Sequence, residues 1–206
     1  MYLPPHFEVS DLSAIHQAME AVGLANLVTW NGTELLSTPL PLILVRDEGE
    51  FGTLYGHLAK ANPQASAPVV GEALALFSGV DAYITPSWYA TKQETGKVVP
   101  TWNYETIHAY GMPEFFQDEV RLLDLVTLLT QHHEGKIGGE WQVSDAPDDF
   151  IRGQLRAIVG FRMAITRLQG KRKMSQNRPL ADREGVAAGL RERGRDDVAD
   201  YIPLSK

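Results

Sequence analysis

The chain has 206 residues, no cysteine and a formal net charge of −7, and 44% of its residues are hydrophobic. This length and apolar content are those of one large globular domain, and the lack of cysteine excludes disulfides, thiolate metal sites and cysteine nucleophiles. The acidic balance argues against a surface that attracts nucleic acid generally. We recognise no signal peptide and no apolar run long enough to span a bilayer, and therefore expect a cytoplasmic protein without a membrane partner.

The charge is unevenly distributed along the chain. Residues 167–195 contain nine Lys or Arg and three Asp or Glu, whereas the remainder contains ten basic and twenty-three acidic residues. Such a basic segment is either a surface that faces phosphate or nucleic acid, or a solvated or subunit-facing surface of a C-terminal helix.

The N-terminal part of the sequence predicts one helix followed by short strands. Ser10 or Asp11 can cap the helix, and Gly23 ends it. Strands are expected at 24–30, 34–45 and 51–58, and Asn31-Gly32 is a hairpin signal between the first two.

Short strands separated by turn signals continue to residue 110. Asn62-Pro63 predicts a short helix or turn, and Pro86 ends a strand. Four more strands are expected at 73–77, 82–85, 98–102 and 106–110. Recurring short strands favour a closed or split β-barrel over a parallel doubly wound sheet.

The rest of the chain alternates helix and strand. Apolar residues at helical spacing predict a helix at 113–133, and further elements are expected as a short helix at 146–154, a long strand at 157–168 and a final helix at 183–193. We therefore expect an α+β, mainly β, fold in a single domain over residues 1–206. It carries a helical insertion near 113–155 and a basic C-terminal segment over 167–206.

Five segments combine polar, cationic and aromatic residues at places where strands end. They are MYLPPHF, HLAKANPQ, YITPSWYATK, VPTWNYETIHAYG and GKRKMSQNRP. This mixture suits a ligand with a flat aromatic part and an anionic tail. In this order the segments resemble the PaiB-type family of FMN-binding negative transcriptional regulators of bacteria, from Met1 to about Leu190. The resemblance implies an FMN-binding split β-barrel of the pyridoxamine phosphate oxidase-like type, with peripheral helices, whose homodimer holds FMN noncovalently between subunits.

The phosphate of FMN requires cationic, hydroxyl or backbone N–H donors. Lys60 resembles the basic position that follows a core strand in flavin-binding split barrels, and we assign it to the phosphate. Ser87 and Lys92 are further phosphate candidates, since Pro86 turns the backbone outward before them. His57 either bonds the flavin or is a core histidine.

Aromatic and amide side chains are expected to frame the flavin ring. Trp88 either flanks the cofactor or caps the barrel core. Thr101, Trp102 and Asn103 lie on one expected strand, where alternation places Thr101 and Asn103 on one face and Trp102 with Tyr104 on the other. Which face meets the flavin stays open at this point.

The run from Lys173 to Arg178 is rich in hydrogen-bond donors. Lys173, Ser175, Gln176 and Asn177 suit an anion or the edge of a flavin, and in a dimer this segment could reach the partner subunit's cofactor. The alternative is a basic turn that leads to the last helix.

The family resemblance implies repression of transcription, but we recognise no helix-turn-helix, so the partner is either DNA or another protein. Two alternatives remain. One is an FMN-dependent oxidoreductase that uses a nicotinamide donor, and the other is a haem-handling split barrel with His6, His57 or His108 as ligand. No phosphate-binding loop, dinucleotide-binding glycine motif or metal-ligand spacing is present in the sequence.

Overall fold

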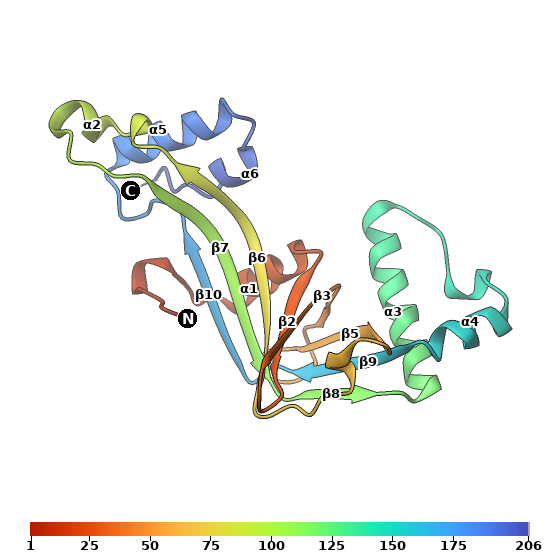
Figure 1. Cartoon of the computed structure of the whole chain (residues 1–206). Helices are drawn as coiled ribbons and strands as arrows, with labels where there is room; N and C mark the ends of the chain where they lie inside the picture. The colour runs from red at the N-terminus through yellow and green to blue at the C-terminus, as the bar shows by residue number, and fades with distance from the viewer. Residues whose placement is uncertain (206) are drawn as a thin grey trace. The chain divides into compact units, whose positions relative to one another are not determined.

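The structure is a computed structural model that describes residues 1–205. The chain divides into two compact units (Figure 1). Unit 1 comprises Met1–Ala18, Ser78–Ile107 and Gln169–Lys206, and unit 2 comprises Met19–Phe77 and His108–Leu168. Every pairing with a defined register is antiparallel, in agreement with the predicted α+β class.

Unit 1 combines a sheet with a cluster of helices. Its strand order is β1-β10-β7-β6. The strands are β1 (Glu8–Val9), β6 (Ala73–Ile84), β7 (Thr101–Gly111) and β10 (Arg167–Lys173), of which the last three continue into unit 2. The helices are η1 (Pro5–Phe7), α1 (Leu12–Ala21), η3 (Pro86–Trp88), α2 (Ala90–Thr95), α5 (Leu180–Arg191) and α6 (Asp196–Ala199), and the last turn of α1, from Met19, belongs to unit 2.

Two glycines let α5 pack directly against η3 in unit 1. A Cβ on Gly185 would lie 2.0 Å from the Trp88 carbonyl oxygen, and one on Gly189 would lie 2.3 Å from the Trp88 ring. The fully buried Asp182 joins α5 to α2, because its carboxylate accepts from the Thr91 N–H and hydroxyl, at 2.9 and 3.0 Å. The helices α2 and α5 are thus fixed around Trp88.

Unit 2 contains a hairpin and a second sheet. The hairpin strands β2 (Ala25–Trp30) and β3 (Leu35–Leu40) turn at Asn31, whose side chain accepts from the Thr33 and Glu34 N–H groups, and β2 also pairs with β6. The second sheet has the order β4-β5-β9-β8. Its strands are β4 (Ile43–Val45), β5 (Thr53–Ala59), β8 (Pro113–Phe116) and β9 (Ile158–Ala164).

Helices α3 (Glu119–Ile137) and α4 (Asp148–Leu155) pack on the second sheet of unit 2. The short helices η2 (Pro63–Ala65) and η4 (Val143–Asp145) complete this unit. Leucines of α3 and α4 form a core with Ile43 and Phe116; these are Leu122, Leu125, Leu129 and Leu155. Among residues 1–205, no helix has both the length and the apolar content needed to cross a bilayer.

Several predicted boundaries are wrong, for identifiable reasons. The helix predicted at 113–133 begins at Glu119, because Pro113–Phe116 pairs with β9 and Asp118 caps the helix through the Arg121 N–H at 2.9 Å. The long strand predicted at 157–168 is two strands, β9 and β10. The strand predicted at 34–45 is likewise two strands, β3 and β4.

Two strand breaks predicted from local sequence are absent. The strands expected at 73–77 and 82–85 form the single strand β6, and those at 98–102 and 106–110 fall on the single strand β7. Gly79 lies within β6, where a Cβ would lie 2.9 Å from the Glu105 carboxylate. This glycine therefore permits a close approach between neighbouring strands and does not end a strand.

Close approach at Gly111 gives a test of packing in unit 2. A Cβ there would lie 2.2 Å from the backbone oxygen of Ala164, whereas a Cβ on Gly153 of α4 meets nothing within 4 Å. We expect Gly111→Ala to lower the free energy of unfolding by about 1–3 kcal/mol, because backbone must move. The control Gly153→Ala should raise it by about 0.5–1 kcal/mol. Urea unfolding measures both, and equal effects would contradict this packing.

Candidate functional site

The twelve residues predicted to bind the cofactor fall in both units. His57 and Lys60 lie in unit 2. The other ten lie in unit 1: Ser87, Trp88, Lys92, Thr101, Trp102, Asn103, Lys173, Ser175, Gln176 and Asn177.

A tightly hydrogen-bonded turn follows β10. Ser175 has φ 63°, and it is the one non-glycine residue with positive φ within residues 1–205. Its hydroxyl is buried and exchanges hydrogen bonds with the fully buried Asn103 amide, at 3.0 and 3.3 Å. The Gln176 side chain accepts from the Met174 N–H at 2.6 Å and donates to the Arg172 carbonyl. These bonds compensate the cost of a left-handed conformation and hold the turn. Asn177 is exposed beside it.

The turn places a lysine against β7. The Lys173 ammonium donates to the Thr101 hydroxyl and to the Trp102 carbonyl, the latter at 2.6 Å. Burial lowers the pKa of Lys173, and the neighbouring charges of Lys171 and Arg178 lower it further. A lysine held among like charges is strained electrostatically unless an anion joins it.

We call Lys171, Lys173 and Arg178 the cation cluster. Lys171 donates to the Tyr2 carbonyl at 3.1 Å, and the guanidinium carbon of Arg178 lies 4.6 Å from the centre of the Tyr89 ring. Within residues 1–205, no carboxylate forms an ion pair with any of the three. By contrast Arg172, between the two lysines, is paired with Glu105. The cluster thus lacks its own counter-charge.

The faces of β7 differ in burial, which bears on the question left open by the sequence. Asn103 and Glu105 lie on the covered face, together with the buried Ile107. Trp102, on the opposite face, is 50% exposed. Its indole N–H donates to the Asp81 carboxylate at 3.1 Å, and its ring lies 6.0 Å from that of Tyr83, which is also 50% exposed. An aromatic ligand therefore finds open ring surface on the Trp102 face.

Ser87, Trp88 and Lys92 lie at the junction of η3 and α2. The Lys92 ammonium donates to the Ser87 hydroxyl at 3.3 Å, and both side chains remain accessible to solvent. Trp88 packs against α5, and the guanidinium carbon of Arg193 lies 5.4 Å from the centre of its ring. Trp88 therefore already has a packing role in unit 1, whereas Ser87 and Lys92 offer free donor capacity.

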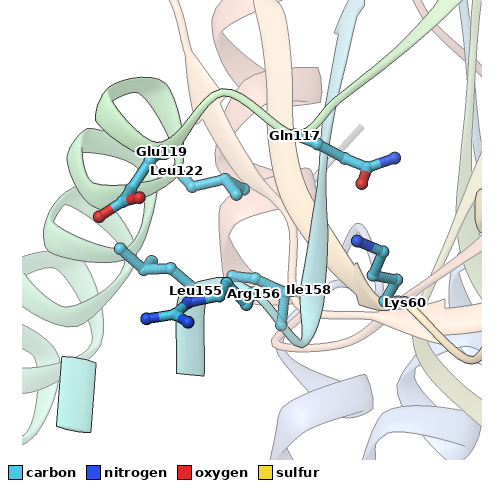
Figure 2. A pocket seen from close by; sticks show the side chains of 7 residues that line it. All are labelled: Lys60, Gln117, Glu119, Leu122, Leu155, Arg156 and Ile158. Atoms are coloured by element: carbon cyan, nitrogen blue, oxygen red, sulfur yellow. The ribbon is translucent and has the colours of Figure 1, made fainter. Parts of the chain in front are cut away.

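In unit 2, Lys60 lies at the end of β5, where its N–H donates to the Ala157 carbonyl at 2.8 Å. Its side chain lines a small hollow of about 90 Å³ together with Arg156, Gln117 and Glu119 (Figure 2). The Lys60 ammonium lies on the side of the Gln117 amide, whereas the Arg156 guanidinium lies on the other side of the hollow, with Glu119 (Figure 2). Lys60 and Gln117 are suitable donors for a phosphate group, and this volume admits such a group but not a flavin ring. His57 lines a different hollow, under α3 and α4.

Sequence reasoning missed Lys171 and Arg156. Lys171 and Lys173 are two residues apart on β10, the spacing that directs side chains to one face of a strand. That signal was available, but the single strand predicted at 157–168 ended before it. Arg156 follows the last residue of α4, and no pattern in the sequence distinguishes it from other surface arginines.

The donor set fits FMN chemically. The three residues of the cation cluster, and Lys60 in its hollow, are cations of the kind that hold a dianionic phosphate. Exposed rings at Trp102 and Tyr83 offer the flat surface that an isoalloxazine requires. No group of three or more His, Cys, Asp or Glu side chains in the described chain is arranged to hold a metal ion.

The Ser175 turn can be tested by two substitutions at the same position. Both Ser175→Ala and Ser175→Gly remove the hydroxyl and leave the buried Asn103 amide without it, which we expect to lower the free energy of unfolding by about 1–3 kcal/mol. Glycine tolerates positive φ, so Ser175→Gly should be the more stable of the two by about 1 kcal/mol. Urea denaturation compares them, and a more stable alanine variant would contradict the left-handed turn.

Known proteins resemble this chain in sequence and in fold. It is 40% identical over 178 residues to an uncharacterised protein of Aspergillus fumigatus, covering 70% of this chain and 68% of the relative. It is 28% identical over 205 residues to the protease synthase and sporulation protein PAI 2 of Bacillus subtilis, covering 99% and 96%. The relatives thus include fungal as well as bacterial proteins.

A solved structure confirms the predicted fold. The FAD and haem binding protein of Mycobacterium smegmatis superposes with a TM-score of 0.60 at 14% identity, covering 88% of this chain and 80% of that one. The fold is that of the FMN-binding split barrels, as predicted. The family described as "Putative FMN-binding domain" matches residues 1–167. The chain therefore belongs to this FMN-binding family, and FMN is its cofactor.

Proposed function

We propose that the protein is a regulatory flavoprotein, a PaiB-like negative regulator of transcription that holds FMN at a homodimer interface. The observation that carries this proposal is the cation cluster, which lacks carboxylate partners within residues 1–205 and lies on a sheet with exposed aromatic rings. A phosphorylated aromatic cofactor supplies both the missing anion and the flat surface. The likeness to the Bacillus sporulation protein over nearly the whole chain supports the regulatory part.

We assign the phosphate to Lys60 and keep Ser87 and Lys92 as further donors. In the homodimer, the turn at Lys173–Arg178 approaches the cofactor of the partner subunit. Thr101 and Trp102 contact the ring. Asn103 and Trp88 act as positioning residues, since both are engaged within unit 1. When bound, FMN supplies a ring that accepts or donates electrons; the chain's own residues bind and orient it.

Two of the C-terminal arginines already pair with carboxylates. Arg191 pairs with Asp200 at 3.0 Å and Asp196 at 3.8 Å, and Arg195 pairs with Asp197 at 2.8 Å. Carboxylates that follow α5 thus compensate these two arginines of the basic segment recognised in the sequence. We propose that repression operates through the flavin or a protein partner, and not through α5 in a DNA groove.

The phosphate assignment is tested by comparing FMN with riboflavin, which has the same ring and no phosphate. We expect Lys60→Met to weaken FMN about 10- to 150-fold, because a charged hydrogen bond contributes about 1.5–3 kcal/mol. Lys173→Met should weaken FMN similarly, and neither should alter riboflavin affinity. Flavin fluorescence titration of the apoprotein measures each constant, with the exposed Lys97→Met as control. Equal losses of affinity for FMN and riboflavin would show that the substituted lysine does not contact the phosphate.

Mixed dimers extend the same experiment to the interface. If Lys60 of one protomer and Lys173 of its partner serve one flavin, a dimer of Lys60→Met and Lys173→Met chains has one intact site. It should bind one FMN per dimer with the native affinity. A mixed dimer without a native-affinity site would place both lysines at sites within one protomer, and a monomer at all concentrations would end the interface proposal.

The role of the C-terminal arginines is tested separately. We expect the triple variant Arg191→Gln, Arg193→Gln, Arg195→Gln to change affinity for a 30-base-pair duplex less than twofold, because Arg191 and Arg195 already face carboxylates. Fluorescence anisotropy at low and moderate salt measures the affinity and its salt dependence. A loss above tenfold with a weaker salt dependence would show direct reading by this segment. Turnover of NADH by the purified flavoprotein would instead favour an oxidoreductase.

A further inference from the structure

A second hollow of unit 2 is not used by the proposed cofactor site. It measures about 260 Å³ and is lined by residues of α3, α4, η4, β5 and β9, together with Trp141. Its lining includes His57, Trp141, Phe150, Ile151, Gln154 and Leu155. No charged side chain lines it, although 22% of the chain's residues are charged. The hollow is thus apolar, with a few polar groups.

His57 leaves an unmet hydrogen-bonding requirement at this hollow. The Nδ1 atom of His57 is buried and has no hydrogen-bond partner within residues 1–205. Burial lowers the pKa of His57, so the imidazole is neutral near pH 7 and Nδ1 can donate or accept according to its tautomer. Buried polar atoms in native proteins normally have a partner, and an unpaired one calls for an explanation such as a ligand.

Two large aromatic side chains at the hollow are exposed. Trp141 is 48% exposed and Phe150 is 56% exposed, although each has apolar neighbours available in unit 2. Aromatic rings around a concave apolar surface with few polar groups are typical of small-molecule sites. Exposed rings of this kind stack on flat ligands.

We propose that this hollow is a second binding site, specific for a small, flat, uncharged aromatic molecule whose edge carries a hydrogen-bonding group for His57. The size suits a bicyclic ring system. The lining itself offers no cation for a phosphate. The Lys60 hollow adjoins this one through Leu155 and Ile158, so FMN with its phosphate at Lys60 is the competing occupant, and displacement of FMN must be measured directly.

The test uses 2-naphthamide and 2-naphthoate on the FMN-loaded full-length protein. The two probes have the same ring and differ in charge. Saturation-transfer NMR and Trp fluorescence report binding, and flavin fluorescence reports release of FMN. We expect the amide to bind without releasing FMN and the carboxylate to bind at least about tenfold more weakly, because the lining would desolvate its charge without pairing it.

Substitutions assign the binding to the hollow. His57→Leu and Phe150→Ala should each weaken 2-naphthamide about 3- to 10-fold, as expected for a lost neutral hydrogen bond or a lost ring contact. The matched controls are His108→Leu and Val120→Ala, which lie in unit 2 outside the lining and should leave affinity unchanged. Phe150 is more than half exposed, so its variant should fold even if His57→Leu does not.

Three outcomes would overturn the proposal. They are no binding of the amide up to its solubility limit, equal binding of amide and carboxylate, and affinity that Phe150→Ala leaves unchanged. Release of FMN in proportion to bound amide would also overturn it, by making the hollow part of the flavin site. None of these results bears on whether the protein binds FMN, which the flavin titration decides independently.

Discussion

The hydrogen bonds between Asn103 and Ser175 are the constraint on which the proposed cofactor-binding part of unit 1 depends. Both side chains are buried, and they join the middle of unit 1's portion of β7 to the turn after β10. Without them, Ser175 would have little reason to keep a positive φ, since serine pays about 1–2 kcal/mol for that conformation. The position of Lys173 on Thr101 and Trp102 follows from the same bonds.

Several arginines of the chain are compensated by carboxylates. Arg46, Arg162, Arg172, Arg191 and Arg195 each pair with a carboxylate of the same unit. The cation cluster does not, within residues 1–205, even though the chain as a whole is acidic. Exposed cations such as Lys97 also form no ion pair within residues 1–205, but Lys173 is part-buried and lies among like charges, which disfavours its charged form unless an anion is present.

Much of the fold was predictable because its signals are local. Asp11 caps α1 through the Ala14 N–H, Asn31 makes the hairpin and Asn62 caps η2, as the sequence indicates. What local signals could not show is how strands cross. Gly79 and Ser78 resemble a turn, yet the approach of Glu105 determines their strand conformation. Pro113–Phe116 continues the apolar spacing of α3, yet pairing with β9 makes it a strand.

The candidate site shows the same division. The composition of Lys173–Arg178 identified it as a run of hydrogen-bond donors, but it did not show which role each residue has. Ser175 and Gln176 hold the turn, whereas Lys173 and Arg178 carry charges without a carboxylate partner. This difference depends on the positive φ of Ser175, which the sequence does not predict. Likewise, the sequence left His57 as either a flavin contact or a core histidine. Its Nδ1 atom is buried without a hydrogen-bond partner in the described chain, and the hollow beside it is lined by α3 and α4, which lie far along the chain.

The cation cluster also determines how the cofactor should act on the protein. Without an anion, burial lowers the pKa of Lys173, and the charges of Lys171 and Arg178 lower it further, which means that the three charges repel one another in the folded chain. A bound phosphate removes that repulsion as well as adding hydrogen bonds, so occupancy should stabilise this turn more than contacts alone would. If the proposed site is correct, flavin occupancy changes the local stability of unit 1. Such a change would give the proposed regulator a signal that does not require Arg191 and Arg195, which are already paired, to bind DNA.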